Sequence, residues 1–148
     1  MIIRALSLGA LETNCYVLGC ADSRQGVVID PADEADEILR AAHDERLAIR
    51  AVLVTHAHFD HIMAAAEVVS ATGAPLALHR TELPLYRQGG GALLFGFPWP
   101  RLPEPGVYIE EGSGIAFGSH TLEVLLTPGH SPGHVSFYER KAGALFCG

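Results

Sequence analysis

The sequence predicts an α/β (α+β) protein, and three features of its hydrophobic pattern support this class. Short β-rich segments lie near both ends of the chain, within residues 2–29 and 115–146. Between them, residues 33–47 carry apolar side chains near helical spacing. Residues 51–54 form a continuous apolar run, which is typical of a strand buried on both faces. With 148 residues and 49% hydrophobic content, the chain is expected to form one domain over residues 1–148.

The first half is expected to begin with three strands joined by short turns. Residues 2–11, 14–18 and 27–29 are β-rich and predict an antiparallel meander. Asp30-Pro31 ends the third strand, and acidic residues crowd the first turn of the helix that residues 33–47 predict. The apolar strand at 51–54 should follow this helix.

A second helix is expected at residues 62–71, an Ala-rich segment that Gly73 ends. A short strand is expected directly after it, at residues 74–78. Residues 89–105 hold three consecutive glycines and four prolines, which predicts a long ordered loop without regular structure. Its aromatic side chains suit either a lid or acyl pocket over a site, or simple surface packing. The last expected strands are these: residues 115–117, 121–126, 135–138 and 144–146.

Composition excludes several classes of partner. The formal charge is −7 and the ten basic residues are dispersed, so a nucleic-acid partner is not expected. No apolar stretch approaches the roughly 18 residues of a membrane span, so no membrane association is expected. Three cysteines without CxxC spacing fit reduced, buried thiols, which favours a cytoplasmic location. A small-molecule substrate is the remaining expectation.

Three imidazoles and a carboxylate lie within six residues, directly after the apolar run at 51–54. His56 and His58 are two residues apart in extended backbone, so both side chains project to one side and can bind one ion. Asp60 and His61 lie where the chain turns into a helix, so they should face a neighbouring position. This spacing favours two metal ions.

A second histidine element, residues 127–134, follows a strand-like run. Its Pro-Gly pairs predict a tight loop that can bring His130 to His56 and His58. Three neutral imidazoles leave one coordination position of a zinc ion open, and hydrolysis is the chemistry such a site supports. His134 is expected to face solvent or to bond the backbone rather than to support a metal ligand.

The two histidine elements resemble the two signatures of the metallo-β-lactamase superfamily. Asn14-Cys15-Tyr16 and the Phe-Gly-Phe-Pro segment at residues 95–98 make the chain most similar to its small glyoxalase II-like (hydroxyacylglutathione hydrolase-like) hydrolases. The resemblance implies an αββα metallo-β-lactamase sandwich with one or two zinc ions, iron and manganese being alternatives. It implies the following metal ligands: His56, His58 and His130 at the first position, Asp60 and His61 at the second.

Family members continue beyond a strand similar to residues 145–148 with an Asp that bridges the metals, and later supply another His. The resemblance therefore implies that the C-terminal part of the second half is missing here, that the second metal position lacks ligands, and that the chain self-associates as a homo-oligomer.

The activity that the resemblance implies is hydrolysis of a small thioester or ester, such as a glutathione thioester, with Asp60 as the catalytic residue that orients the nucleophile or relays its proton. Alternatives within the fold are a lactonase, a phosphodiesterase or an iron-dependent persulfide dioxygenase. A truncated, inactive metal-binding domain is the non-enzymatic alternative.

Overall fold

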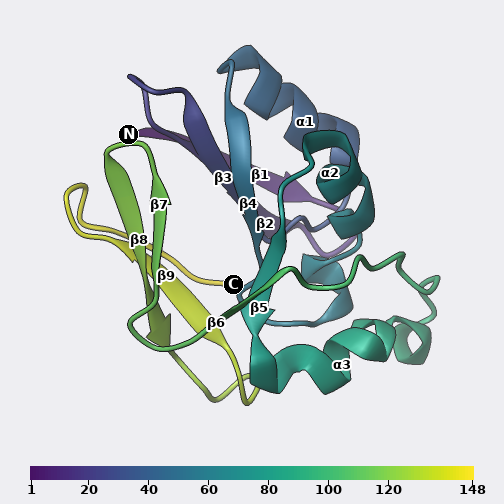
Figure 1. Cartoon of the computed structure of the whole chain (residues 1–148). Coiled ribbons are helices and arrows are strands. Elements are labelled where there is room, and N and C mark those ends of the chain that lie inside the picture. Colours follow the sequence, from purple (N-terminus) through teal and green to yellow (C-terminus); the bar gives the residue numbers. More distant parts are fainter.

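The computed structural model describes residues 1–148, and two β-sheets face each other in it, with helices on the outer face of the larger sheet (Figure 1). The larger sheet has the order β1 (Ile2–Leu8), β2 (Thr13–Gly19), β3 (Gln25–Ile29), β4 (Ala48–Leu53), β5 (Leu76–His79) and β6 (Val107–Ile109). The smaller sheet has the order β10 (Ala144–Phe146), β9 (Val135–Glu139), β8 (His120–Leu126) and β7 (Gly114–Phe117). The predicted mixed α/β class is confirmed.

Strand direction in the larger sheet changes at β3. The first three strands pair antiparallel, as the sequence predicts, whereas β3, β4, β5 and β6 pair parallel. The helices lie in the connections of this parallel part: α1 (Ala35–Asp44), η1 (Phe59–His61), α2 (Ala65–Thr72), η2 (Arg80–Glu82), α3 (Leu83–Arg87) and η3 (Gly89–Phe95). The carboxyl ends of β3, β4 and β5 therefore meet at one edge, the usual position of a ligand site in a parallel sheet.

Helix α1 is shorter than the helix predicted over residues 33–47. Its buried side chains, Ile38 and Ala42, are four residues apart and so lie on one face. Glu34 before the helix and Arg46 after it both have left-handed backbone angles, with φ of 50° and 54°. These conformations end the helical hydrogen-bonding pattern at both sides.

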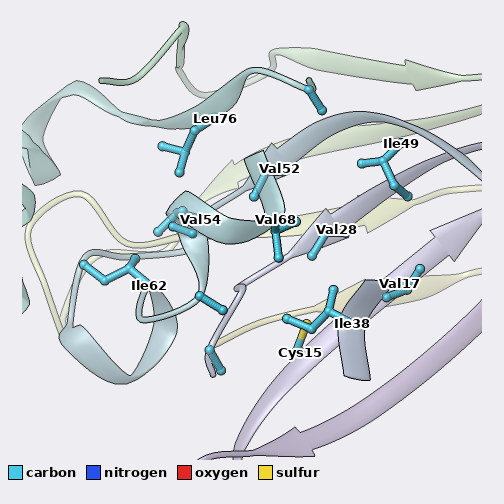
Figure 2. Packing of buried hydrophobic residues seen from close by; sticks show 14 of the residues in the cluster. Cys15, Val17, Val28, Ile38, Ile49, Val52, Val54, Ile62, Val68 and Leu76 are labelled. Atoms are coloured by element: carbon cyan, nitrogen blue, oxygen red, sulfur yellow. The ribbon is translucent and has the colours of Figure 1, made fainter. Parts of the chain in front are cut away.

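One hydrophobic core lies between the helices and the larger sheet (Figure 2). Ile38 of α1 and Val68 of α2 pack there with Val28 and Val52 of the central strands, and all four are at most 1% exposed. Burying such a side chain contributes about 1.5–3 kcal/mol to folding. This core fixes the helices against the sheet and thereby the loops at its carboxyl edge.

A second core lies between the two sheets. Ile29 and Leu53, which neighbour Val28 and Val52 in sequence, point to this opposite face and pack in a cluster with Phe137. Successive residues of β3 and β4 therefore enter different cores, which explains why residues 27–29 and 51–54 are unbroken apolar runs.

The structure has three of the four layers that the αββα pattern implies. Helices α1 and α2 cover one face of the larger sheet, and no helix covers the outer face of the smaller sheet (Figure 1). None of the helices has both the length and the apolar composition of a membrane span.

Three expectations from the sequence differ from the structure. Residues 89–105 are not wholly irregular, because η3 occupies the first seven of them. The short elements α3 and β6 were not predicted, since each has at most five residues and lies beside prolines. Cys15 and Cys20 are buried as expected, but Cys147 is exposed.

Candidate metal centre

Two loops bring the histidines together at the carboxyl edge of the larger sheet. The first histidine loop, residues 54–58, follows β4, and the second histidine loop, residues 127–134, connects β8 to β9. A backbone hydrogen bond from Val135 to the carbonyl of Thr55, 2.9 Å long, joins the two loops. The strand ends of both sheets thus place the histidines.

His56, His58 and His130 each offer a ring nitrogen, and the three nitrogens lie within 4.8 Å of one another. Nδ1 of His58 and Nε2 of His130 are 2.9 Å apart. Nε2 of His56 is the one buried side-chain nitrogen or oxygen without a hydrogen-bond partner. Each zinc–nitrogen bond is about 2.0–2.1 Å long, so two nitrogens on one ion lie at most about 4.2 Å apart. The 2.9 Å pair lies within this limit, and the 4.8 Å bound on all three lies slightly above it. The three residues therefore fit a metal ion.

The ring of His56 is held in the orientation that leaves Nε2 free. Its Nδ1 lies 3.1 Å from Oγ1 of Thr55, and that hydroxyl donates to Oδ2 of Asp30 at 2.7 Å. Because the Thr55 hydrogen is used on Asp30, Nδ1 of His56 must be the donor to Thr55. Burial, with further contributions from the neighbouring histidines, lowers the pKa of His56 to about 2. His56 is therefore neutral and carries its lone pair on Nε2, as a metal ligand requires.

His61 and Asp60 lie beside this cluster, with the His56 and His61 ring centroids 4.1 Å apart. Nδ1 of His61 is 2.9 Å from Oδ2 of Asp30, and Nε2 is 3.3 Å from Oδ2 of Asp60. Burial lowers the pKa of His61, but the hydrogen bond and charge of Asp30, with the charge of Asp60, raise it overall. Oγ1 of Thr13 donates to Asp60 at 2.8 Å. Asp60 and His61 thus present an oxygen and a nitrogen to one point.

Asp30 is a central residue of the site that sequence reasoning missed. It is fully buried, and its carboxylate accepts from the backbone N–H and hydroxyl of Thr55 and bonds His61. The sequence interpretation took Asp30 only as the end of a strand. Its position offered a signal: Asp30 directly follows β3, and Thr55-His56 follows β4, the adjacent parallel strand. Glu82 and Thr13 also contact the site, and no motif marked them.

The expectation for His134 is wrong. Its side chain is buried, with 7% exposed, and Nδ1 is 2.9 Å from Oγ1 of Thr127. Its ring centroid lies 4.9 Å from that of His56. His134 therefore packs against the ring of His56 and bonds Thr127 instead of facing solvent.

The glycine- and aromatic-rich segment packs against the first histidine loop. The rings of Phe95 and Phe97 lie 5.6 and 4.7 Å from the ring of Phe59, which directly follows His58. Gly90, with φ of 63°, lies so close that a Cβ atom there would be 2.6 Å from the carbonyl oxygen of Ala57. The segment therefore supports the loop from outside.

Replacing Gly90 with alanine should destabilise the protein by about 1–3 kcal/mol more than the same change at Gly91. Both glycines have left-handed φ angles, but a Cβ atom at Gly91 meets only a side-chain carbon at 3.9 Å. Chemical denaturation of both variants measures the difference, which isolates the close contact from the backbone strain. Equal losses of stability would show that the contact with the loop is not restrictive.

A small cavity lies next to Asp60 and is lined mainly by apolar side chains, including Leu11, Phe59 and Phe97. Leu11 is also exposed at the surface, as are Phe95 and Trp99. A larger groove elsewhere, between β1 and α1, is lined by acidic side chains and includes none of the histidines. The apolar surface beside Asp60 is thus the one adjacent to the candidate metal centre.

Comparisons with known proteins give concordant matches. The family model described as the metallo-beta-lactamase superfamily matches residues 8–148. The probable metallo-hydrolase YqgX of Bacillus subtilis is 36% identical over 149 residues, covering 98% of this chain and 69% of that protein. The hydroxyacylglutathione hydrolase of Thermosynechococcus vestitus is 34% identical over 143 residues, covering 95% and 50%. The crystal structure of TTHA1623 in a di-iron-bound form has a TM-score of 0.84 and 38% identity, covering 96% and 69%.

Proposed function

Because this chain belongs to the metallo-β-lactamase superfamily, whose members are mostly metal-dependent hydrolases, we propose that it hydrolyses a small thioester or ester. The observation that carries the proposal is the group of three imidazole nitrogens within 4.8 Å, one of them buried without a partner. His56, His58 and His130 are the proposed ligands of the first metal ion. A zinc ion bound there lowers the pKa of a coordinated water to about 7 and polarises a substrate carbonyl.

Asp60 and His61 are the proposed ligands of a second ion, and Asp60 is the proposed catalytic residue. Thr13 donates to Oδ2 of Asp60, and His61 faces the same oxygen, so the carboxylate has a defined orientation. In this position Asp60 orients the attacking water or accepts its proton. Asp30 fixes His61 from behind through Nδ1 and leaves Nε2 toward Asp60.

The proposed substrate is the thioester of a small acyl group with glutathione. One similar relative is a hydroxyacylglutathione hydrolase, and the matched region spans half of that protein. The apolar side chains around Asp60 can contact the carbon chain of an acyl group that lies over this surface, and such contacts exclude water from the reacting carbonyl.

The activity test uses the chain after metal removal and reconstitution with zinc, manganese or iron. An acyl-glutathione thioester should be cleaved only after reconstitution, and Asp60→Asn should lower kcat by a factor of about 10²–10⁴, the usual range for a proton-transfer residue. Release of free thiol measures the rate. Metal-loaded protein that cleaves neither thioesters nor simple esters would overturn the proposal.

A second candidate is an iron-dependent persulfide dioxygenase of the same fold; one similar structure was solved in a di-iron-bound form, which supports iron as an alternative metal. The two activities differ in metal and co-substrate. Iron-loaded protein that consumes oxygen with glutathione persulfide, and does not cleave thioesters, would favour this alternative.

Replacing Phe97 with alanine should raise KM for an acyl thioester more than it lowers kcat, because the ring is part of the apolar surface beside Asp60 and would supply uniform binding energy. Trp99→Ala is the matched aromatic control, since Trp99 is 54% exposed and does not line this cavity. Steady-state kinetics on both variants provides the measurement. A fall in kcat with unchanged KM for Phe97→Ala would argue against a substrate-binding role.

A further inference from the structure

Glu82 is a buried carboxylate that neither histidine motif contains. It is the last residue of η2, directly before α3, and only 1% of it is exposed. None of the ion pairs in the structure includes it. A buried carboxylate without a cationic partner is costly, so its hydrogen bonds must carry a specific benefit.

The two oxygens of Glu82 bond to different histidine loops. Oε2 accepts the backbone N–H of Ala57 at 2.9 Å, and Ala57 lies between His56 and His58. Oε1 accepts the hydroxyl of Ser131 at 2.8 Å and the backbone N–H of Gly133 at 2.7 Å. One side chain from a third element thus connects the loop of the first two imidazoles to the loop of the third.

The second histidine loop reaches Glu82 only because residue 133 is a glycine. A Cβ atom at Gly133 would lie 3.0 Å from the carboxylate of Glu82 and 2.8 Å from Nδ1 of His79. Figure 1 shows the turn between β8 and β9 beside the start of α3, where this contact is made. The close approach of backbone to carboxylate is therefore built into the sequence of the loop.

We propose that Glu82 is a positioning residue that holds the two histidine loops at the separation required to bind one metal ion between them. The inference rests on the proposed function, because it assumes the three-imidazole metal site. Glu82 contacts neither the ion nor the substrate in this role. It acts through the backbone of Ala57 and Gly133 and the side chain of Ser131.

The main test titrates metal-free protein with Co²⁺ and follows its visible absorption, which reports both affinity and ligand geometry. Glu82→Gln should bind Co²⁺ about 10- to 100-fold more weakly, the usual effect of removing a group that orients ligands, and its absorption bands should shift. The carboxamide has one oxygen, so it cannot accept from both loops at once.

Glu139→Gln is the matched control. Glu139 is also 1% exposed and also accepts a backbone N–H, that of Ala142, but its other partner is His120, the first residue of β8. This variant should lower the melting temperature of the metal-free protein and leave Co²⁺ affinity and spectrum unchanged. Unchanged affinity and spectrum in folded Glu82→Gln as well would overturn the inference.

Glu82→Asp separates reach from charge. It retains the negative charge but is one methylene shorter, so it should bind Co²⁺ as weakly as Glu82→Gln. Full recovery of Co²⁺ affinity would show that the charge of residue 82 matters and its hydrogen bonds to the two loops do not, which would overturn the inference. If Glu82→Gln fails to fold, Ser131→Ala decides, since it removes one donor and should weaken Co²⁺ binding by a smaller factor. Unmodified protein that binds no metal would instead refute the proposed metal site itself.

Discussion

Replacing His56 with alanine should reduce affinity for the first metal ion by more than about 100-fold. Removing a group that only orients a ligand usually reduces affinity by about 10- to 100-fold, so loss of a ligand itself should cost more. The change deletes one of three proposed ligands, and it deletes the one whose free nitrogen is buried without a partner. Two imidazoles cannot close the site, so zinc should be lost during dialysis against a weak chelator. Metal content per chain, measured after dialysis, gives the result.

His130→Ala should have the same consequence, because His130 is the proposed ligand from the second histidine loop. Its Nε2 lies beside Nδ1 of His58. His43→Ala is the control for both variants. The side chain of His43 is 90% exposed on α1, and its one charged neighbour is Asp44. Zinc stoichiometry equal to that of the unmodified chain in both His56→Ala and His130→Ala would rule out this ligand set.

The fold class could be predicted from the sequence because its apolar runs are continuous where a strand contributes side chains to both cores. Residues 51–54 read as a strand buried on both faces, and Val52 and Leu53 do enter opposite cores. The meander of β1, β2 and β3 was predicted from short turns between β-rich runs and is confirmed. Because neighbouring residues of these strands pack in opposite cores, both must be apolar, and this pattern is visible in the local sequence.

Elements of three to five residues left no such signal. Helix α3 has Pro84 in its first turn and only Tyr86 buried, so its pattern is too short to show helical periodicity. Strand β6 follows a proline-rich stretch and pairs only with β5. These elements form because tertiary packing stabilises them, and local propensity alone does not indicate them.

The motif histidines could be singled out because their spacing is local, whereas the groups that orient them come from distant segments. Glu82 is 25 residues from Ala57 and 51 from Gly133. Asp30 is 25 residues from Thr55, to which it is bonded only because β3 and β4 are adjacent parallel strands. A single sequence carries no spacing rule for such contacts, and only the strand-end position of Asp30 gave an indication.

Replacing Asp30 with alanine should cost about 3–5 kcal/mol of the free energy of unfolding, as is usual when one partner of a buried charged hydrogen-bond group is removed. The change leaves the N–H and hydroxyl of Thr55 and the Nδ1 of His61 without their shared acceptor in a fully buried position. Chemical denaturation of metal-free protein measures the loss. Asp33→Asn, at an exposed position three residues away, should change stability little.

Asp30→Asn tests the orienting role separately from stability. The amide nitrogen cannot accept a hydrogen bond, so an amide that still accepts from the backbone of Thr55 turns its NH₂ group toward Nδ1 of His61. His61 then has to accept on Nδ1 and carry its proton on Nε2, the nitrogen that faces Asp60. A protonated Nε2 cannot bind a metal, so this variant should lose the second ion. The first ion should be weakened less, because the hydroxyl of Thr55 loses its acceptor on Asp30 but can still accept from Nδ1 of His56. Metal titration that shows equal loss of both ions, or of neither, would contradict the assignment of Asp30 as the residue that sets the ring of His61.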